Sequence, residues 1–197
     1  MKNNYFVTML RSLLAILVCI FSTNLFAVTE VHVEKAGTLP SLLTSTDSEL
    51  KVTGVINGTD IKFIRELVTA GTVTRLDWSG VKIVAGGEAY FESFKTEDNV
   101  IGEKMFTECS NLQSIVLPST LSSILSNAFS RTGLKQVDIP NSVTRIGSDA
   151  FAYCNSLQKV IVGKRVTHLG QGVFFSSAVR YAYVKPITPP APPVYLF

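Results

Sequence analysis

The sequence has only two histidines and three cysteines, which limits the chemistry that the chain can support. His32 and His168 lie at opposite ends of the chain's repeated region, so the sequence offers no histidine-rich metal site and no Cys–His pair. It also contains neither a G-x-S-x-G motif nor a Gly-Lys-Ser/Thr phosphate loop. These absences predict a protein with no cofactor and no enzymatic activity.

The chain lacks an apolar run long enough to cross a membrane, which takes roughly 20 residues. Its longest such run, residues 13–21, stops at the polar triplet Ser-Thr-Asn. Lys2 and Arg11 precede this run, and the small residue Ala27 follows it. This order predicts a secretory signal peptide over residues 1–27. We therefore expect export to the cell surface, the extracellular space or the periplasm, with no membrane span once the signal is removed.

Charged residues are scarce, at 17% of the chain, and their two signs are unevenly spread. Removal of residues 1–27 would take away Lys2 and Arg11 and leave 16 basic and 15 acidic side chains. Residues 28–110 hold 8 basic and 13 acidic residues, whereas residues 111–197 hold 8 and 2. Such an asymmetric field can steer a partner or orient head-to-tail association. The basic residues are spaced singly, so we expect no nucleic-acid partner.

Apolar residues, in contrast, repeat with a period of 22–23 residues. Four apolar positions keep the same phase through four units over residues 101–186, of which the last unit is incomplete. They are Phe106, Phe129, Phe151 and Phe174; Ile101, Ile124, Ile146 and Leu169; Ile115, Val137, Val160 and Ala182; and Leu117, Ile139, Val162 and Val184. The spacing Leu-x-x-Ile-x-Leu predicts an α/β leucine-rich-repeat solenoid with one short strand per coil.

The repeated pattern I-G-x-x-A-F-x-x-C-x-x-L-x-x-V-x-L-P resembles the BspA-like leucine-rich repeats of exported bacterial proteins. Residues 36–43, 52–67, 74–80 and 81–91 resemble the segment often found ahead of such repeats in Bacteroidetes-type proteins. Residues 28–100 are therefore expected to form a divergent N-terminal cap with an early repeat-like strand. Because some BspA-like proteins are adhesins for host matrix or plasma proteins, the resemblance implies a protein-binding function.

Local patterns predict several elements of this cap and of the coils. Residues 50–54 and 74–78 are expected to be strands, and residues 59–67 a helix capped by Thr59 or Asp60. Asn57-Gly58-Thr59 favours a tight turn. Residues 89–99 are interpreted as a charged, irregular connection. The stretches EKMF and SDAF are each expected to form a single helical turn.

Strand alternation leaves a ladder of outward-facing side chains, and we predict that this strip binds a partner. The residues singled out are Arg75, Gln113, Lys135, Gln136, Asp138, Gln158, Lys159, Arg180, Tyr181 and Tyr183. Tyrosine and arginine are over-represented where binding energy concentrates, which favours a protein ligand. A glycan-binding module is the alternative. It would favour more aromatic side chains than the two tyrosines at the end of the strip.

Cys109 and Cys154 occupy equivalent positions two coils apart, which is about 10 Å at a strand spacing of about 4.8 Å. A disulfide bridges Cα atoms only up to about 7 Å apart. Thr132 and Ser177 take the same position in the other units, so the position requires a small side chain rather than a thiol. We therefore predict two free, buried cysteines.

The last eleven residues, 187–197, form a proline-rich tail that is poorly suited to continue the coil. The strand over residues 180–184 has no following coil in the sequence and would present an unpaired edge. Two outcomes are open: the tail packs over this edge, or two chains pair there.

Overall fold

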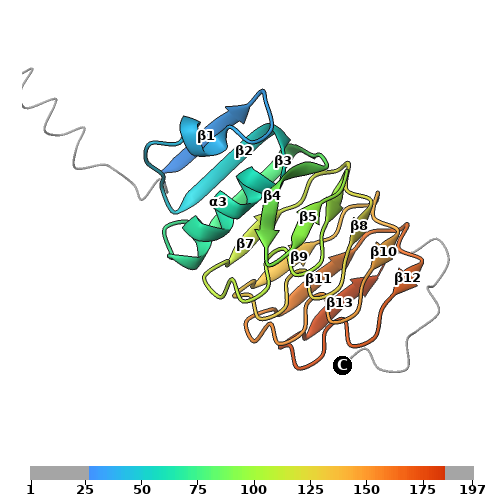
Figure 1. The fold of residues 1–197 in the computed structure, drawn as a ribbon. Coiled ribbons are helices and arrows are strands. Elements are labelled where there is room, and N and C mark those ends of the chain that lie inside the picture. Colours follow the sequence, from blue (N-terminus) through green and yellow to red (C-terminus); the bar gives the residue numbers. More distant parts are fainter. Residues whose placement is uncertain (1–26, 185–197) are drawn as a thin grey trace, which may run out of the picture.

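The computed structural model describes residues 27–184 of the chain, which form an elongated stack of coils (Figure 1). The predicted signal peptide, apart from Ala27, and the proline-rich tail lie outside the described residues. Within the described range, no helix combines the length and the apolar character needed to cross a bilayer.

The first part of the stack contains strands, two helices and a hairpin. Its elements are β1 (Val28–Val33), α2 (Leu39–Leu42), β2 (Glu49–Ile56), α3 (Gly58–Thr69), β3 (Arg75–Ile83), β4 (Gly86–Phe91) and β5 (Phe94–Thr96). The repeated part follows as β6 (Val100–Ile101), β7 (Ser114–Val116), β8 (Ser123–Ile124), β9 (Gln136–Asp138), β10 (Arg145–Ile146), β11 (Lys159–Val162), β12 (His168–Leu169) and β13 (Tyr181–Val184).

Parallel pairing between successive coils builds the stack. One sheet has the order β1-β2-β3-β7, a second the order β13-β11-β9, and a third the order β12-β10-β8-β6. Each coil thus contributes the predicted strand and a further two-residue strand. The parallel order, one coil per repeat, confirms the predicted α/β leucine-rich-repeat solenoid.

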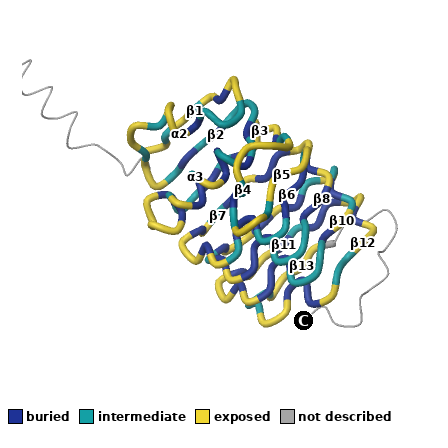
Figure 2. The backbone as a smooth tube through the Cα atoms, in the orientation of Figure 1, coloured by how far each residue is buried: buried dark blue, intermediate teal, exposed yellow. Residues whose placement is uncertain are grey.

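A column of stacked aromatic rings runs along the core. In Figure 2 the buried residues of each coil are marked in dark blue along the backbone. The ring centroids of Phe106 and Phe129 are 5.5 Å apart, those of Phe129 and Phe151 5.1 Å, and those of Phe151 and Phe174 5.8 Å. Trp78 of β3 extends the column, with its ring centroid 5.3 Å from that of Phe106. The phenylalanine repeat therefore encodes a continuous aromatic column that begins in the cap.

The predicted helical turns at EKMF and SDAF are wrong. In the first coil Lys104 and Glu108 have left-handed backbone conformations, with φ of 54° and 62°, which interrupt a helix every fourth residue. The Phe106 N–H donates to the Ala128 carbonyl of the next coil at 2.7 Å, and the Lys104 N–H to the Ser126 carbonyl at 3.1 Å. Alternate amides of the turn, those of Lys104, Phe106 and Glu108, therefore pair with carbonyls of the next coil, which binds the turns into the stack.

The helix of the cap begins earlier than predicted. Asn57 is the N-cap of α3, because its side chain accepts a hydrogen bond from the Thr59 N–H at 3.0 Å. Asp60 completes a capping box by accepting from the Asn57 N–H at 2.9 Å. Of the two predicted cap residues, Asp60 thus takes part in the cap, whereas the N-cap position itself belongs to Asn57 rather than Thr59 and the predicted tight turn at Asn57 is wrong.

Residues 89–99 are not an irregular connection, as predicted, but contribute to the antiparallel hairpin of β4 and β5. The hairpin packs beside α3, where the Arg65 guanidinium lies 4.4 Å from the centre of the Phe91 ring. Tyr90 is buried and its hydroxyl donates to the Glu103 carbonyl at 2.8 Å. Burial raises the pKa of Tyr90 above its ordinary value, so this donor stays protonated well into the alkaline range.

Cys109 and Cys154 are free and buried, as predicted. The Cys154 thiol donates to the Phe129 carbonyl at 3.1 Å, and the Thr132 hydroxyl lies 3.2 Å from its sulfur. Thr132 thus occupies the equivalent position in the coil between the two cysteines, as the repeat alignment predicted.

We expect neither thiol to react with iodoacetamide in the folded chain at mildly alkaline pH, and both to react after unfolding in urea. Burial raises the pKa of both thiols above the ordinary value of 9.0. Their contribution to stability is therefore present below about pH 9 and lost as the pH rises further, because only the unfolded chain ionises them readily. Mass spectrometry of alkylated peptides and urea titrations at increasing pH measure both effects. A disulfide between Cys109 and Cys154 would contradict the coil register.

Candidate functional site

The outward residues of the last three long strands lie in two aligned rows. Parallel pairing places Gln136 beside Lys159 and Lys159 beside Tyr181. The second row joins Asp138, Ile161 and Tyr183 in the same way. The strand register therefore brings these predicted site residues together, while the intervening Val137 and Val160 are buried in the core.

A third row lies just before these strands and is aligned by backbone hydrogen bonds. The Lys135 N–H donates to the Gln113 carbonyl at 3.2 Å, the Gln158 N–H to the Lys135 carbonyl at 2.9 Å, and the Arg180 N–H to the Gln158 carbonyl at 3.0 Å. All four side chains are exposed. Each coil thus presents one polar residue of this row to solvent.

Arg75, the remaining predicted residue, lies beside Ser114 in the neighbouring pair of strands. Its Nε donates to the Glu49 carboxylate at 2.9 Å, in a pair whose two side chains are each about 30% exposed, at 27% and 31%. This ion pair holds the Arg75 side chain within the cap sheet. Arg75 is therefore less available to a partner than the other predicted residues.

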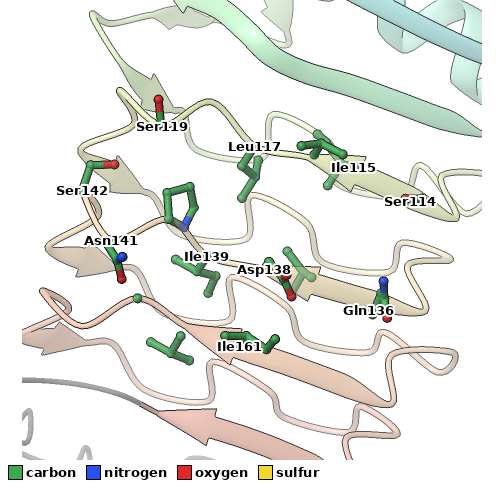
Figure 3. A pocket seen from close by; sticks show the side chains of 15 residues that line it. Ser114, Ile115, Leu117, Ser119, Gln136, Asp138, Ile139, Asn141, Ser142 and Ile161 are labelled. Atoms are coloured by element: carbon green, nitrogen blue, oxygen red, sulfur yellow. The ribbon is translucent and has the colours of Figure 1, made fainter.

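The strip is not one unbroken ladder, as the repeat suggested. β7 belongs to the cap sheet and β9 to the sheet of the later coils. A hollow of about 610 Å³ lies over this junction, lined by residues of β7, β9 and β11 and of the turns that follow them (Figure 3). The strip is thus hollowed at the place where strand pairing is interrupted.

Apolar and polar side chains are mixed in the lining of the hollow (Figure 3). Val116 is 47% exposed and Ile161 half-buried, and Asp138 pairs with Ile161 in the second row. Asn141 and Ser142 contribute from the turn after β9. The Ser142 hydroxyl oxygen is buried and has no hydrogen-bond partner among the described residues. Sequence reasoning missed these two turn residues, because a Ser/Asn-rich turn carries the same pattern whether or not it lines a hollow.

Several polar side chains of the strip are not engaged by the protein itself. Across residues 27–184, no hydrogen bond or ion pair involves the side chains of Lys135, Gln136, Asp138, Lys159 or Arg180. Solvated polar groups beside exposed apolar ones are the composition of many protein-binding surfaces. The arrangement can therefore bind a partner by contact and charge.

No cluster of three or more histidine, cysteine, aspartate or glutamate side chains in the described part of the chain could hold a metal ion. The two histidines lie on β1 and β12, at opposite ends of the stack.

Comparison with known proteins gives one family match. A family model described as BspA type leucine rich repeat region (6 copies) matches residues 88–188. No curated protein matches the chain.

Three solved structures are similar to parts of the chain. A leucine-rich repeat protein from Bacteroides ovatus ATCC 8483 is 28% identical, with a TM-score of 0.43, over 58% of this chain and 32% of that one. The pneumococcal vaccine antigen PcpA is 14% identical, with a TM-score of 0.35, over 72% and 32%. A leucine rich cell surface protein from Faecalibacterium prausnitzii A2-165 is 13% identical, with a TM-score of 0.34, over 79% and 64%. The chain thus spans about a third of the first two proteins and less than two thirds of the third.

Proposed function

Because the chain belongs to the BspA-type leucine-rich repeat proteins, we propose that it is an exported, non-enzymatic binding module that acts as an adhesin. Its outward strand face is the surface that contacts the partner. Repeat solenoids commonly use such extended faces to bind other proteins. The observation that supports this proposal most is the hollow over β7, β9 and β11, flanked by polar side chains that form no hydrogen bond or ion pair with the described residues.

The charges of the strip favour a protein partner with a mostly acidic surface. Lys135, Lys159 and Arg180 outnumber Asp138 on the rows of β9, β11 and β13. Since the mature chain would be exported, a protein of the host matrix or host cell surface is the proposed ligand. A glycan is the alternative ligand, and it would depend chiefly on stacking against the exposed ring of Tyr181.

Two variants of the strip are expected to weaken binding without unfolding the protein. Replacing Tyr181 and Tyr183 together by alanine removes two exposed rings, and Val116→Glu places a charge in the hollow. Each variant should weaken binding at least about tenfold, since anchor residues at the centre of interfaces contribute about 2 kcal/mol or more and about 1.4 kcal/mol corresponds to a tenfold change. Biolayer interferometry against immobilised extracellular-matrix proteins measures the affinity, and a thermal melt measures the fold.

Tyr153→Ala is the matched control. Tyr153 is an exposed aromatic residue on the turn side of the coils, where it contacts Phe175 and Arg131. The Tyr153→Ala variant should bind the partner as tightly as the unmodified protein. Equal affinity of the strip variants and the control would exclude the strand face as the binding surface, and binding to a glycan array but not to matrix proteins would favour the alternative ligand.

A further inference from the structure

The two ends of the coil stack each present the edge of a parallel sheet. β1 lies at one end and β13 at the other (Figure 1). Among the described residues, β1 pairs only with β2, and β13 only with β11. Strand edges carry backbone N–H and C=O groups that can pair with another chain. Because the pairing between coils is parallel throughout, either edge can accept a strand of the same direction.

The charges of the two ends are opposite. Residues 28–49 contain one basic and four acidic side chains, a net charge of 1 − 4 = −3. Residues 150–184 contain four basic and no acidic side chains, a net charge of +4. The basic residues of that end are Lys159, Lys164, Arg165 and Arg180. The first end of one molecule therefore attracts the last end of another, whereas two like ends repel.

Exposed apolar side chains are concentrated at the same two ends. Seven large apolar residues are exposed among the described residues, and five of them lie at the ends. Val28 and Leu42 belong to the first end, and Phe175, Tyr181 and Tyr183 to the last coil. Val28 is 41% exposed and Tyr181 71%. Apolar surface at both ends would be removed from water if the ends met.

The strand register makes the two ends compatible in detail. Val28 pairs with Glu49, Glu49 with Arg75, and Arg75 with Ser114. Tyr181 occupies the equivalent row of the later coils, beside Lys159. Continuing this row by one strand would place Val28 of a second molecule next to Tyr181. The two exposed apolar side chains would then cover each other.

We propose that the chain associates head to tail with a second copy of itself, with β1 of one molecule adding in parallel to β13 of the next. The contact is heterologous, since different surfaces meet, so it extends into open chains rather than closed dimers. Each added molecule lengthens the outward strand face. The assembly depends on charge complementarity and weakens as salt screens the two ends.

A charge exchange between the ends tests the proposal on the full mature chain. One variant carries Glu30→Lys and Glu34→Lys, so both of its ends are basic. The other carries Lys164→Glu and Arg165→Glu, which lowers the net charge of its last end from +4 to 2 − 2 = 0 and removes the attraction to the acidic first end. At low salt, the average mass of the unmodified protein in sedimentation experiments should rise with concentration. Each variant alone should stay monomeric, whereas their equimolar mixture should associate again, and circular dichroism confirms that each is folded.

Any of three results would overturn the proposal. The unmodified chain could be monomeric at every concentration, which would mean that another segment, such as residues 185–197, covers β13. The variants could associate as strongly as the unmodified chain. The mixture could fail to regain association after both variants have lost it.

Cross-linking tests the register directly. Adjacent strands lie about 4.8 Å apart, within the Cα separation that a disulfide spans. Mixing a Val28→Cys variant with a Tyr181→Cys variant under oxidising conditions should give a disulfide-linked heterodimer. Val116→Cys, an exposed residue in the middle of the strip, is the control and should give none with either. Homodimers of the Val28→Cys or the Tyr181→Cys variant in place of the heterodimer would show like ends meeting and would contradict the proposed pairing.

Discussion

Replacing Phe129 by alanine is expected to lower the free energy of unfolding by about 3–5 kcal/mol. The ring is fully buried and lies in the middle of the aromatic column. It stacks on Phe106 at an interplanar angle of 8° and on Phe151 at 9°. The substitution removes its buried apolar surface, leaves a cavity and abolishes two aromatic contacts. Loss of this ring therefore weakens the contacts of the second coil with both of its neighbours.

Urea titration and thermal melting measure the effect of Phe129→Ala. A loss of this size corresponds to a fall in melting temperature of about 6–20 °C for a domain of this length. Phe175→Ala is the matched control, because Phe175 is 44% exposed, and it should change stability by no more than about 0.5 kcal/mol. Equal effects of the two substitutions would show that position 129 is not part of a buried column.

Replacing Arg65 by methionine is expected to destabilise the protein by about 3 kcal/mol. Arg65 is a buried residue of α3 and is only 8% exposed. Its Nη1 donates to the Met105 carbonyl at 2.5 Å, and its Nη2 to the Thr107 carbonyl at 3.4 Å. The methionine retains much of the apolar stem but leaves buried carbonyls of the first coil without a donor. The Arg65 side chain of the cap thus donates hydrogen bonds to backbone carbonyls in the turn of the first repeat.

Arg65→Lys and Lys62→Ala are the comparisons for this prediction. Lysine keeps the charge but lacks the planar fork that reaches several carbonyls, so we expect an intermediate loss of stability. Lys62 is an exposed residue of the same helix that pairs with Glu88 at 2.6 Å. Its removal should change stability little, because solvent screens such pairs. Full stability of Arg65→Met in urea titration would refute the role of Arg65 as the link between cap and coils.

The repeated part of the fold could be predicted because every coil faces the same packing problem. A position that is buried in one coil is buried in the next, so Phe106, Phe129, Phe151 and Phe174 recur in phase. Trp78 keeps the strand spacing within the cap, yet its place at the head of the aromatic column appears only in three dimensions.

The wrong predictions concern places where the structure is decided by a single interaction that does not recur from coil to coil. Asn57-Gly58-Thr59 has the composition of a turn, but the Asp60 carboxylate fixes Asn57 as a helix cap. The hairpin of β4 and β5 depends on its packing against α3, which the charged sequence of residues 89–99 does not reveal.

The same distinction applies to the candidate site. The rows through Lys159 and Tyr181 follow from the repeat spacing, and the parallel pairing of β11 with β13 places these two residues side by side. The hollow depends on the interrupted pairing between β7 and β9, and the engagement of Arg75 depends on Glu49 of a neighbouring strand. Neither feature is periodic, so the spacing of residues could not indicate it.

Hydroxyl-radical footprinting of the mature chain bound to extracellular-matrix proteins tests the proposed binding surface most directly. Side chains that a partner covers become less reactive than in the unbound chain. The strand-face model predicts protection of Val116, Ile161 and Tyr181, while Tyr153 and Phe175 on the turn side remain as reactive as before. Protection of Tyr153 and Phe175 with an unchanged strand face would contradict it.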